Sequence, residues 1–129
     1  MKVLAAVARI LLGVIFAFFG ANLMFNFLHM QLPPPGPDRD FTAIMASTHY
    51  LVVIGFFQLL GGVLLLINRW VALGLTILAA EIVNILTTHI LVMGGAGLVG
   101  LPLVVVLLWL IVFWRVRGAF AGIFQARID

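Results

Sequence analysis

The residue best suited to perform chemistry is Glu81, a carboxylic acid at the middle of the apolar stretch Val71–Met93. This stretch has 23 residues, which would rise about 35 Å as an α-helix, enough to cross a hydrocarbon layer of about 30 Å. A charged carboxylate at the centre of a membrane costs at least about 2.5–3.5 kcal/mol, and intramembrane acids usually serve a function. We therefore expect Glu81 to face a bundle interior or a cavity and to contribute to a site.

Further polar residues share the helix with this acid. On ideal helical spacing, Asn84 and Thr88 fall with Glu81 within an arc of about 60°, and His89 lies about 80° from Glu81. Candidate partners of Glu81 on facing helices are Asn22, Asn26 and Gln58, and His29 and His49 are further candidate residues of the same pocket. This set predicts a polar pocket. Its carboxylate and imidazole groups could exchange protons near neutral pH.

A regular spacing predicts where this pocket opens. Arg9 and His29, His49 and Arg69, and Arg69 and His89 are each twenty residues apart, or about 30 Å along a helix. If the arginines mark one membrane boundary, the three histidines lie at the other. The amide, hydroxyl and carboxyl groups of the set then lie in the outer half of the membrane or at mid-depth, so we expect the pocket to open outward.

His49 and Gln58 are nine residues apart and point in opposite directions on an ideal helix, unless His49 lies in the turn before it. Gln58, which lies deeper in its span, is therefore the better inward candidate.

The polar set has two interpretations. It could bind a small molecule or cofactor: a quinone head group, a metal ion, or haem between two histidines. Alternatively, polar residues at span ends contact lipid headgroups, and buried ones form hydrogen bonds between helices. The histidines as a set favour the structural interpretation, and Glu81 favours the functional one. No HxxxH or HExxH spacing supports a metal or haem site, so we expect neither.

Composition excludes an ordinary soluble domain. The chain of 129 residues is 65% hydrophobic and 9% charged, whereas soluble domains are about 25% charged. This length suffices for one domain of four spans, without a separate catalytic module. The absence of cysteine excludes disulfides, thiolate metal sites and CxxC redox centres. The net charge of +3 is spread over span ends, which does not indicate nucleic-acid binding.

We predict an all-α integral membrane protein, a bundle of four transmembrane helices in a single domain 1–129. The predicted spans are at about 3–27, 46–67, 71–93 and 98–114, with a short amphipathic C-terminal tail. An outer loop at 30–41 contains four prolines within five residues, which predicts a stiff extended connector. Close helix contacts are expected along the small-residue stripe of the first span and at Gly61-Gly62.

Charge predicts the orientation. Six of the seven basic residues fall on one side if the N-terminus is cytoplasmic: Lys2, Arg9, Arg69, Arg115, Arg117 and Arg127. Only Arg39 falls on the other side. We therefore expect both termini in the cytoplasm and a multi-pass protein of the bacterial inner membrane.

The chain resembles the DoxX-like family of small four-span bacterial membrane proteins. The resemblance covers nearly the whole length and is carried by ARILLGVIFAFFG, by FLHM followed by PPPGP, by GGVLLLINRW and by VNILTTH. It implies a four-helix bundle and relatives associated with thiosulfate:quinone oxidoreduction or membrane-bound oxidant defence, with more distant relatives acting as assembly chaperones or cargo receptors. His29, Asn84 and His89 match residues common in similar members. Gln58 stands where Glu is common, and Glu81 where an apolar residue or Pro is frequent.

These observations predict a non-catalytic binding or redox-accessory component whose pocket holds a quinone-like or lipidic ligand. The alternatives are a structural accessory subunit of a larger membrane complex and, with less support, a small transporter or assembly chaperone. Expected partners are the lipid bilayer and either a larger complex or further copies of the chain. We expect no stand-alone enzyme, because the sequence shows no nucleophile–base pair, phosphate loop or metal motif.

Overall fold

The computed structural model describes residues 1–128, and within that range every regular element is helical. The elements in chain order are α1 (Lys2–Phe25), α2 (Pro37–Ser47), α3 (Tyr50–Leu66), α4 (Val71–Thr87), the π-helical turn η1 (Thr88–Val92), α5 (Leu101–Val116) and the 3-10 helix η2 (Arg117–Phe124). Three continuous helical segments are long and apolar enough to cross a membrane, at Lys2–Phe25, Val71–Val92 and Leu101–Phe124. A fourth crossing is present if α2 and α3, which meet at an angle of 84°, count as one bent span.

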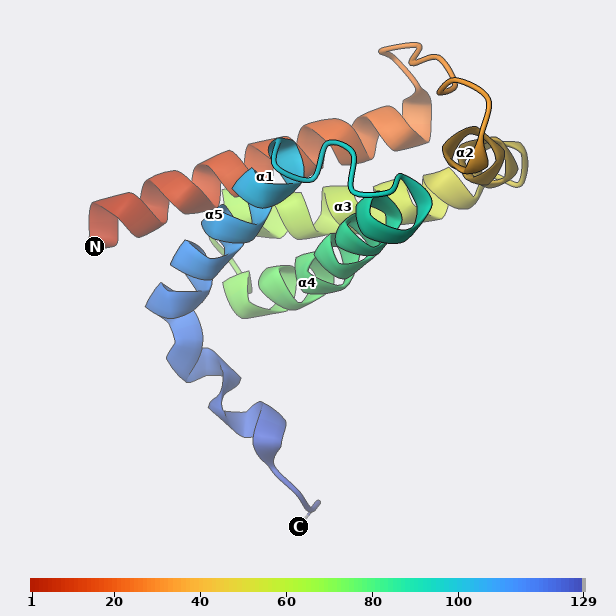
Figure 1. Cartoon of the computed structure of the whole chain (residues 1–129). Helices are drawn as coiled ribbons and strands as arrows, with labels where there is room; N and C mark the ends of the chain where they lie inside the picture. The colour runs from red at the N-terminus through yellow and green to blue at the C-terminus, as the bar shows by residue number, and fades with distance from the viewer. Residues whose placement is uncertain (129) are drawn as a thin grey trace.

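The helices form a bundle in which α3 lies between α1 and α4, and α5 packs against α1 and α4 (Figure 1). Apolar side chains from these helices fill the core: Leu12, Phe16, Leu65, Leu75, Leu78, Ile82, Val105 and Val112. One directional contact adds to this packing, because the indole N–H of Trp109 on α5 donates to the Leu75 carbonyl oxygen on α4 at 2.9 Å. The apolar stretches thus form packed helices, as predicted, with three candidate membrane spans, or four if the bent pair counts as one.

Glycines allow the close approach of α1 and α3. A methyl group added at Gly20 would lie 2.5 Å from the backbone nitrogen of Leu59, and one at Gly62 would lie 2.6 Å from the backbone nitrogen of Ala17. Gly61 faces the other way and contacts Leu78 on α4. The Gly61-Gly62 pair therefore lets α3 approach two neighbours at once, which extends the prediction of close crossings at this pair.

The outer loop ends earlier than predicted, because α2 begins inside the stretch 30–41. Pro37 occupies the first turn of α2, where its missing N–H costs nothing, and Asp38 and Asp40 place negative charge near the positive helix N-terminus. Between α1 and α2, the extended and turn backbone comprises residues 26–36. The proline run therefore acts as a connector only up to Gly36, and the last proline starts a helix.

The predicted second span, 46–67, is interrupted near its start. The hydroxyl of Thr48 donates to the Ile44 carbonyl oxygen at 2.7 Å, and His49 adopts a left-handed backbone conformation with φ of 61°. These features end α2 and turn the chain into α3, so the straight part of this span is Tyr50–Leu66. Hydropathy averaged over a span does not show this break, because the polar step Ser47-Thr48-His49 is only three residues long.

The last span begins at Leu101, with Pro102 in its first turn, and continues beyond 114 as α5 and η2. The η2 segment runs away from the bundle toward the C-terminus (Figure 1). Phe120 on η2 stacks at a tilt on Phe113, with ring centroids 5.1 Å apart. The predicted helical tail is therefore present as a 3-10 helix, and its Phe124 side chain is exposed.

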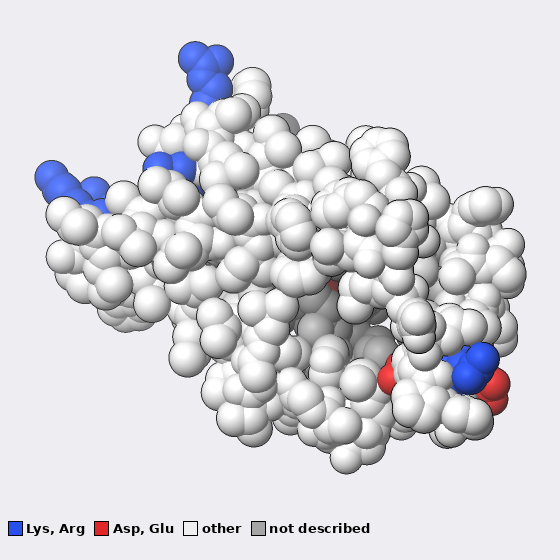
Figure 2. All heavy atoms as spheres, turned by 90° about the horizontal axis from the view of Figure 1, so that it is seen from above, with Lys and Arg blue, Asp and Glu red and all other residues white. Residues whose placement is uncertain are grey.

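Charged side chains collect at opposite ends of the molecule. The surface view shows only basic side chains at one end and a mixed acidic and basic group at the other (Figure 2). Lys2, Arg9 and Arg115 gather around one hollow, whereas Asp38 and Asp40 are in the first turn of α2. This separation is the feature on which the predicted orientation depends.

Candidate functional site

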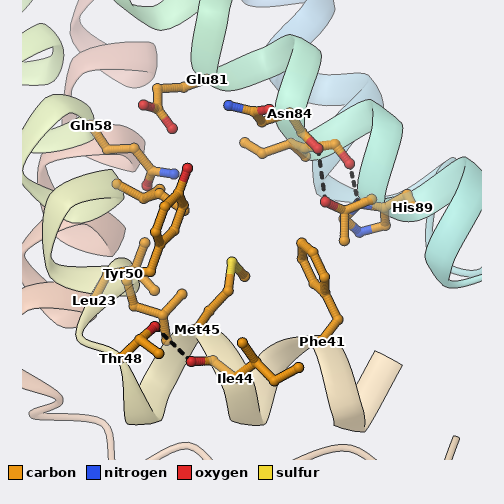
Figure 3. A pocket seen from close by; sticks show the side chains of 14 residues that line it. Leu23, Phe41, Ile44, Met45, Thr48, Tyr50, Gln58, Glu81, Asn84 and His89 are labelled. Carbon is orange, nitrogen blue, oxygen red and sulfur yellow. Dashed lines mark hydrogen bonds between the residues drawn. The ribbon is translucent and has the colours of Figure 1, made fainter. Parts of the chain in front are cut away.

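A cavity of about 470 Å³ lies among α2, α3 and the C-terminal half of α4 with η1 (Figure 3). One end is polar, with the side chains of Gln58, Glu81 and Asn84 directed into it. The opposite end is closed by the apolar face of α2, which contributes Phe41 and Met45. The cavity therefore combines a polar end with an apolar wall, the usual composition of a small-molecule pocket.

Glu81 lies at the polar end and is only 7% exposed. Its Oε2 atom is buried and has no hydrogen-bond partner among the described residues. Gln58, which is 6% exposed, lies beside Glu81 at the same end of the cavity, on α3 (Figure 3). A buried carboxyl oxygen without a partner costs about 1–3 kcal/mol or more, so this atom is suited to receive a group from a bound molecule.

The C-terminal part of the helix holds two more polar residues. The Thr88 hydroxyl donates to the backbone carbonyl oxygen of Asn84 at 2.9 Å, and His89 Nδ1 lies 2.7 Å from the Ile85 carbonyl oxygen. Since a carbonyl oxygen only accepts, Nδ1 carries a hydrogen in this contact, and Nε2 is left for other partners. The Thr88 hydroxyl is thus used within the helix, while His89 keeps one nitrogen for a ligand.

The helix changes geometry at this point. Residues 88–92 form a π-helical turn in which the Met93 N–H donates to the Thr88 carbonyl oxygen at 3.0 Å. Such turns contain one extra residue and often occur at functional sites. Here the turn includes His89, whose ring borders the loop at Gly97.

A second cavity of about 280 Å³ lies on the other side of Gln58 and His89, toward α1 and α5. The two cavities share the residues Leu23, Gln58, Ile85 and His89. The second one is lined mostly by apolar residues, including Phe16, Phe19 and Val105. The two spaces thus meet at a wall of two polar and two apolar side chains.

Asn22 lines the second cavity but already has partners. It is 5% exposed, and its Oδ1 accepts from the Leu28 N–H at 3.0 Å. Its Nδ2 donates to the Met30 sulfur at 3.6 Å. This arrangement holds the chain as it leaves α1, so Asn22 supports the fold beside the site.

Three predicted residues do not join either cavity: Asn26, His29 and His49. All three are exposed and have left-handed backbone conformations, with φ of 50°, 50° and 61°. Asn26 ends α1, donating its N–H to the Asn22 carbonyl oxygen at 2.6 Å. The twenty-residue spacing assumes straight helices, but the chain leaves the helix before His29 and bends at His49, so of the three histidines only His89 lines the cavities.

Sequence reasoning missed the contribution of α2 and of Tyr50. Phe41, Ile44, Met45 and Thr48 all line the first cavity and follow the i, i+3, i+4, i+7 spacing of one helical face. That pattern, starting after Gly-Pro-Asp, was a usable signal for a short amphipathic helix. The hydroxyl of Tyr50 points toward the polar end of the cavity (Figure 3).

Residues 1–128 contain no group of three or more His, Asp or Glu residues placed to hold a metal ion. Comparison of the chain with family models, with curated proteins and with solved structures found no match. The functional groups around the first cavity include one carboxyl, two amides, one imidazole and one phenol.

Proposed function

We propose that this protein binds a small amphiphilic molecule with a quinone-like or lipidic head group, as a binding or redox-accessory component of a membrane. The observation that carries the proposal is the buried Oε2 of Glu81, which lacks a partner and borders the polar end of a 470 Å³ cavity. Natural small-molecule pockets have volumes of about 300–1,000 Å³ and few polar groups. The cavity fits both criteria.

The polar end suits a head group that both accepts and donates hydrogen bonds. An ionised carboxylate at Glu81 accepts from a hydroxyl, and a protonated carboxyl donates to a carbonyl. The amides of Gln58 and Asn84 can serve either partner. A quinone presents carbonyls and the corresponding quinol presents hydroxyls at the same positions, so one pocket of this composition can hold both forms.

The apolar part of the cavity suits the remainder of such a molecule. Phe41 and Met45 of α2 face the polar end across the cavity (Figure 3). Aromatic and methionine side chains pack adaptably against rings and alkyl chains. The sequence contains no cysteine, so a role in electron transfer would require the bound molecule or a partner protein to carry the electrons.

The test measures binding of decylubiquinone and of its reduced quinol to the purified protein in nanodiscs, by quenching of tryptophan fluorescence. We expect saturable binding, weakened at least tenfold in Glu81→Leu and less in Glu81→Gln, which retains hydrogen-bonding capacity. Thr76→Val is the matched control. Thr76 lies on the same helix, and its hydroxyl donates to the Ala72 carbonyl oxygen at 2.8 Å. Equal binding by wild-type protein and Glu81→Leu would refute the proposal.

We also propose membership of the DoxX-like family and a location in the bacterial inner membrane with both termini cytoplasmic. The sequence resemblance supports the family, and the grouping of Lys2, Arg9 and Arg115 at one end supports the orientation. Labelling of single cysteines introduced at Lys2 and Asp38 in intact and permeabilised cells tests the orientation. Labelling of the first position in intact cells would contradict it.

A further inference from the structure

A third hollow, of about 380 Å³, lies at the end of the bundle that carries the N-terminus, away from the candidate site. It is bordered by the first turns of α1, the last turns of α5 and the connection between α3 and α4. Its charged and polar lining residues are Lys2, Arg9, Asn68 and Arg115, and its apolar ones are Ala5, Ala6, Val71, Val112 and Val116. Three of the seven basic residues of the chain thus meet at one place.

The fold fixes the deepest of these cations. Arg9 is half-buried, and its guanidinium donates to the carbonyl oxygen of Leu65 and, at 3.5 Å, to that of Leu66. These contacts hold Arg9 at the negative C-terminal end of α3. A guanidinium has five N–H donors, so Arg9 keeps donors for a further acceptor.

The charge at this hollow is unbalanced. No acidic residue is among its lining residues, and no ion pair of Lys2, Arg9 or Arg115 is found within residues 1–128. Lys2 and Arg115 are exposed, and both lie on helices apolar enough to span a membrane. The hollow therefore has three cations and no carboxylate among its lining residues.

Aromatic and apolar residues near the hollow indicate that its anionic occupant is a lipid. Trp70 and Trp114 lie at the same end and are 66% and 57% exposed, as expected of aromatic residues at the level of lipid headgroups. The apolar part of the wall includes Val71 and Val116, which are half-buried and so remain partly accessible. An occupant with a phosphate and alkyl chains could use the cations and this apolar wall at once.

We infer that this hollow is a binding site for the phosphate of an anionic phospholipid, with Lys2, Arg9 and Arg115 contacting the phosphate and with Val71 and Val116 contacting the acyl chains. Basic pockets between helices at the cytoplasmic side of a membrane are suited to anionic headgroups. The site is separate from the cavity at Glu81, and its assignment does not depend on the proposed ligand of that cavity.

The experiment is native mass spectrometry of the delipidated full chain, titrated separately with phosphatidylglycerol, phosphatidylcholine and inorganic phosphate. We expect preferential retention of phosphatidylglycerol over phosphatidylcholine. In the double variant Lys2→Gln/Arg115→Gln this affinity should fall about 25-fold, since each cation near an anionic headgroup contributes about a factor of five. The charge-retaining variant Lys2→Arg/Arg115→Lys should stay within a few-fold of wild type.

The chain offers a matched control for the loss of charge. Arg69→Gln/Arg117→Gln also removes two positive charges from this end of the molecule, but from residues that do not line the hollow. An equal loss of phosphatidylglycerol affinity in this control would overturn the proposed site, because it would show that the lipid responds to the overall charge of this end. Equal affinity for both phospholipids would also overturn it, and binding of inorganic phosphate as tight as that of phosphatidylglycerol would assign the hollow to free phosphate instead.

Discussion

Replacing Gly20 by alanine tests the close contact that positions Gln58. A methyl group at Gly20 would lie 2.5 Å from the Leu59 nitrogen, 2.7 Å from the Gly55 carbonyl oxygen and 3.0 Å from the Gln58 Cβ. Ordinary van der Waals contact begins at about 3.4 Å, so α1 and α3 must separate by about 0.9 Å at this point. Two of the three contacted atoms belong to the backbone and cannot rotate away.

The magnitude follows from two opposing effects. Overpacking of a well-packed interior costs about 1–3 kcal/mol, and replacement of glycine by alanine within a helix returns about 0.5–1 kcal/mol. We therefore expect Gly20→Ala to lower the free energy of unfolding by about 0.5–2 kcal/mol. Because α3 carries Gln58 into both cavities, the same separation should weaken decylubiquinone binding.

The assay is unfolding by titration of mixed micelles with sodium dodecyl sulfate, followed by circular dichroism. Gly118→Ala is the matched control, since a methyl group there meets no atom within 4 Å. A larger substitution, Gly20→Leu, should destabilise further. Unchanged or increased stability in Gly20→Ala would refute the reasoning, because it would mean that the backbones of α1 and α3 do not approach this closely.

Two further predictions concern hydrogen bonds that hold the helices. Asn22→Leu should cost about 1–3 kcal/mol in the same titration, because it leaves the Leu28 N–H without its acceptor; an unchanged free energy of unfolding would argue against this role. Trp109→Phe should cost about 0.5–1.5 kcal/mol by removing the N–H that donates to the Leu75 carbonyl oxygen, and Trp114→Phe, where no such bond is found within residues 1–128, should cost less.

The helices could be predicted from the sequence because a membrane span depends on length and hydropathy. The stretch around Glu81 is apolar for longer than a hydrocarbon layer requires, and the structure contains a continuous helical segment at Val71–Val92. The face shared by Glu81, Asn84 and Thr88 followed from helical periodicity alone, and all three line one cavity. Predictions of this kind need only local geometry.

The remainder of the site could not be predicted in this way because it depends on where helices end. His29 and His49 were placed by counting residues along straight helices, but the chain turns at both positions with positive φ. The apolar face of α2 was hidden by the prolines before it, which suggested an extended loop. A break, a cap and a bend are local events of a few residues, and each one changes the position of everything that follows it.

The break between α2 and α3 also determines how the candidate site is closed. A straight helix over 46–67 would carry Met45 beyond the end of α3, away from Glu81. The 84° bend instead lays α2 across the cavity, so that Phe41 and Met45 face its polar end (Figure 3). The Thr48 hydroxyl, bonded to the Ile44 carbonyl oxygen, helps to end α2 where this bend is needed. The wall opposite Glu81 thus comes from a polar loop segment that has become a helix, which is why hydropathy placed it outside the bundle.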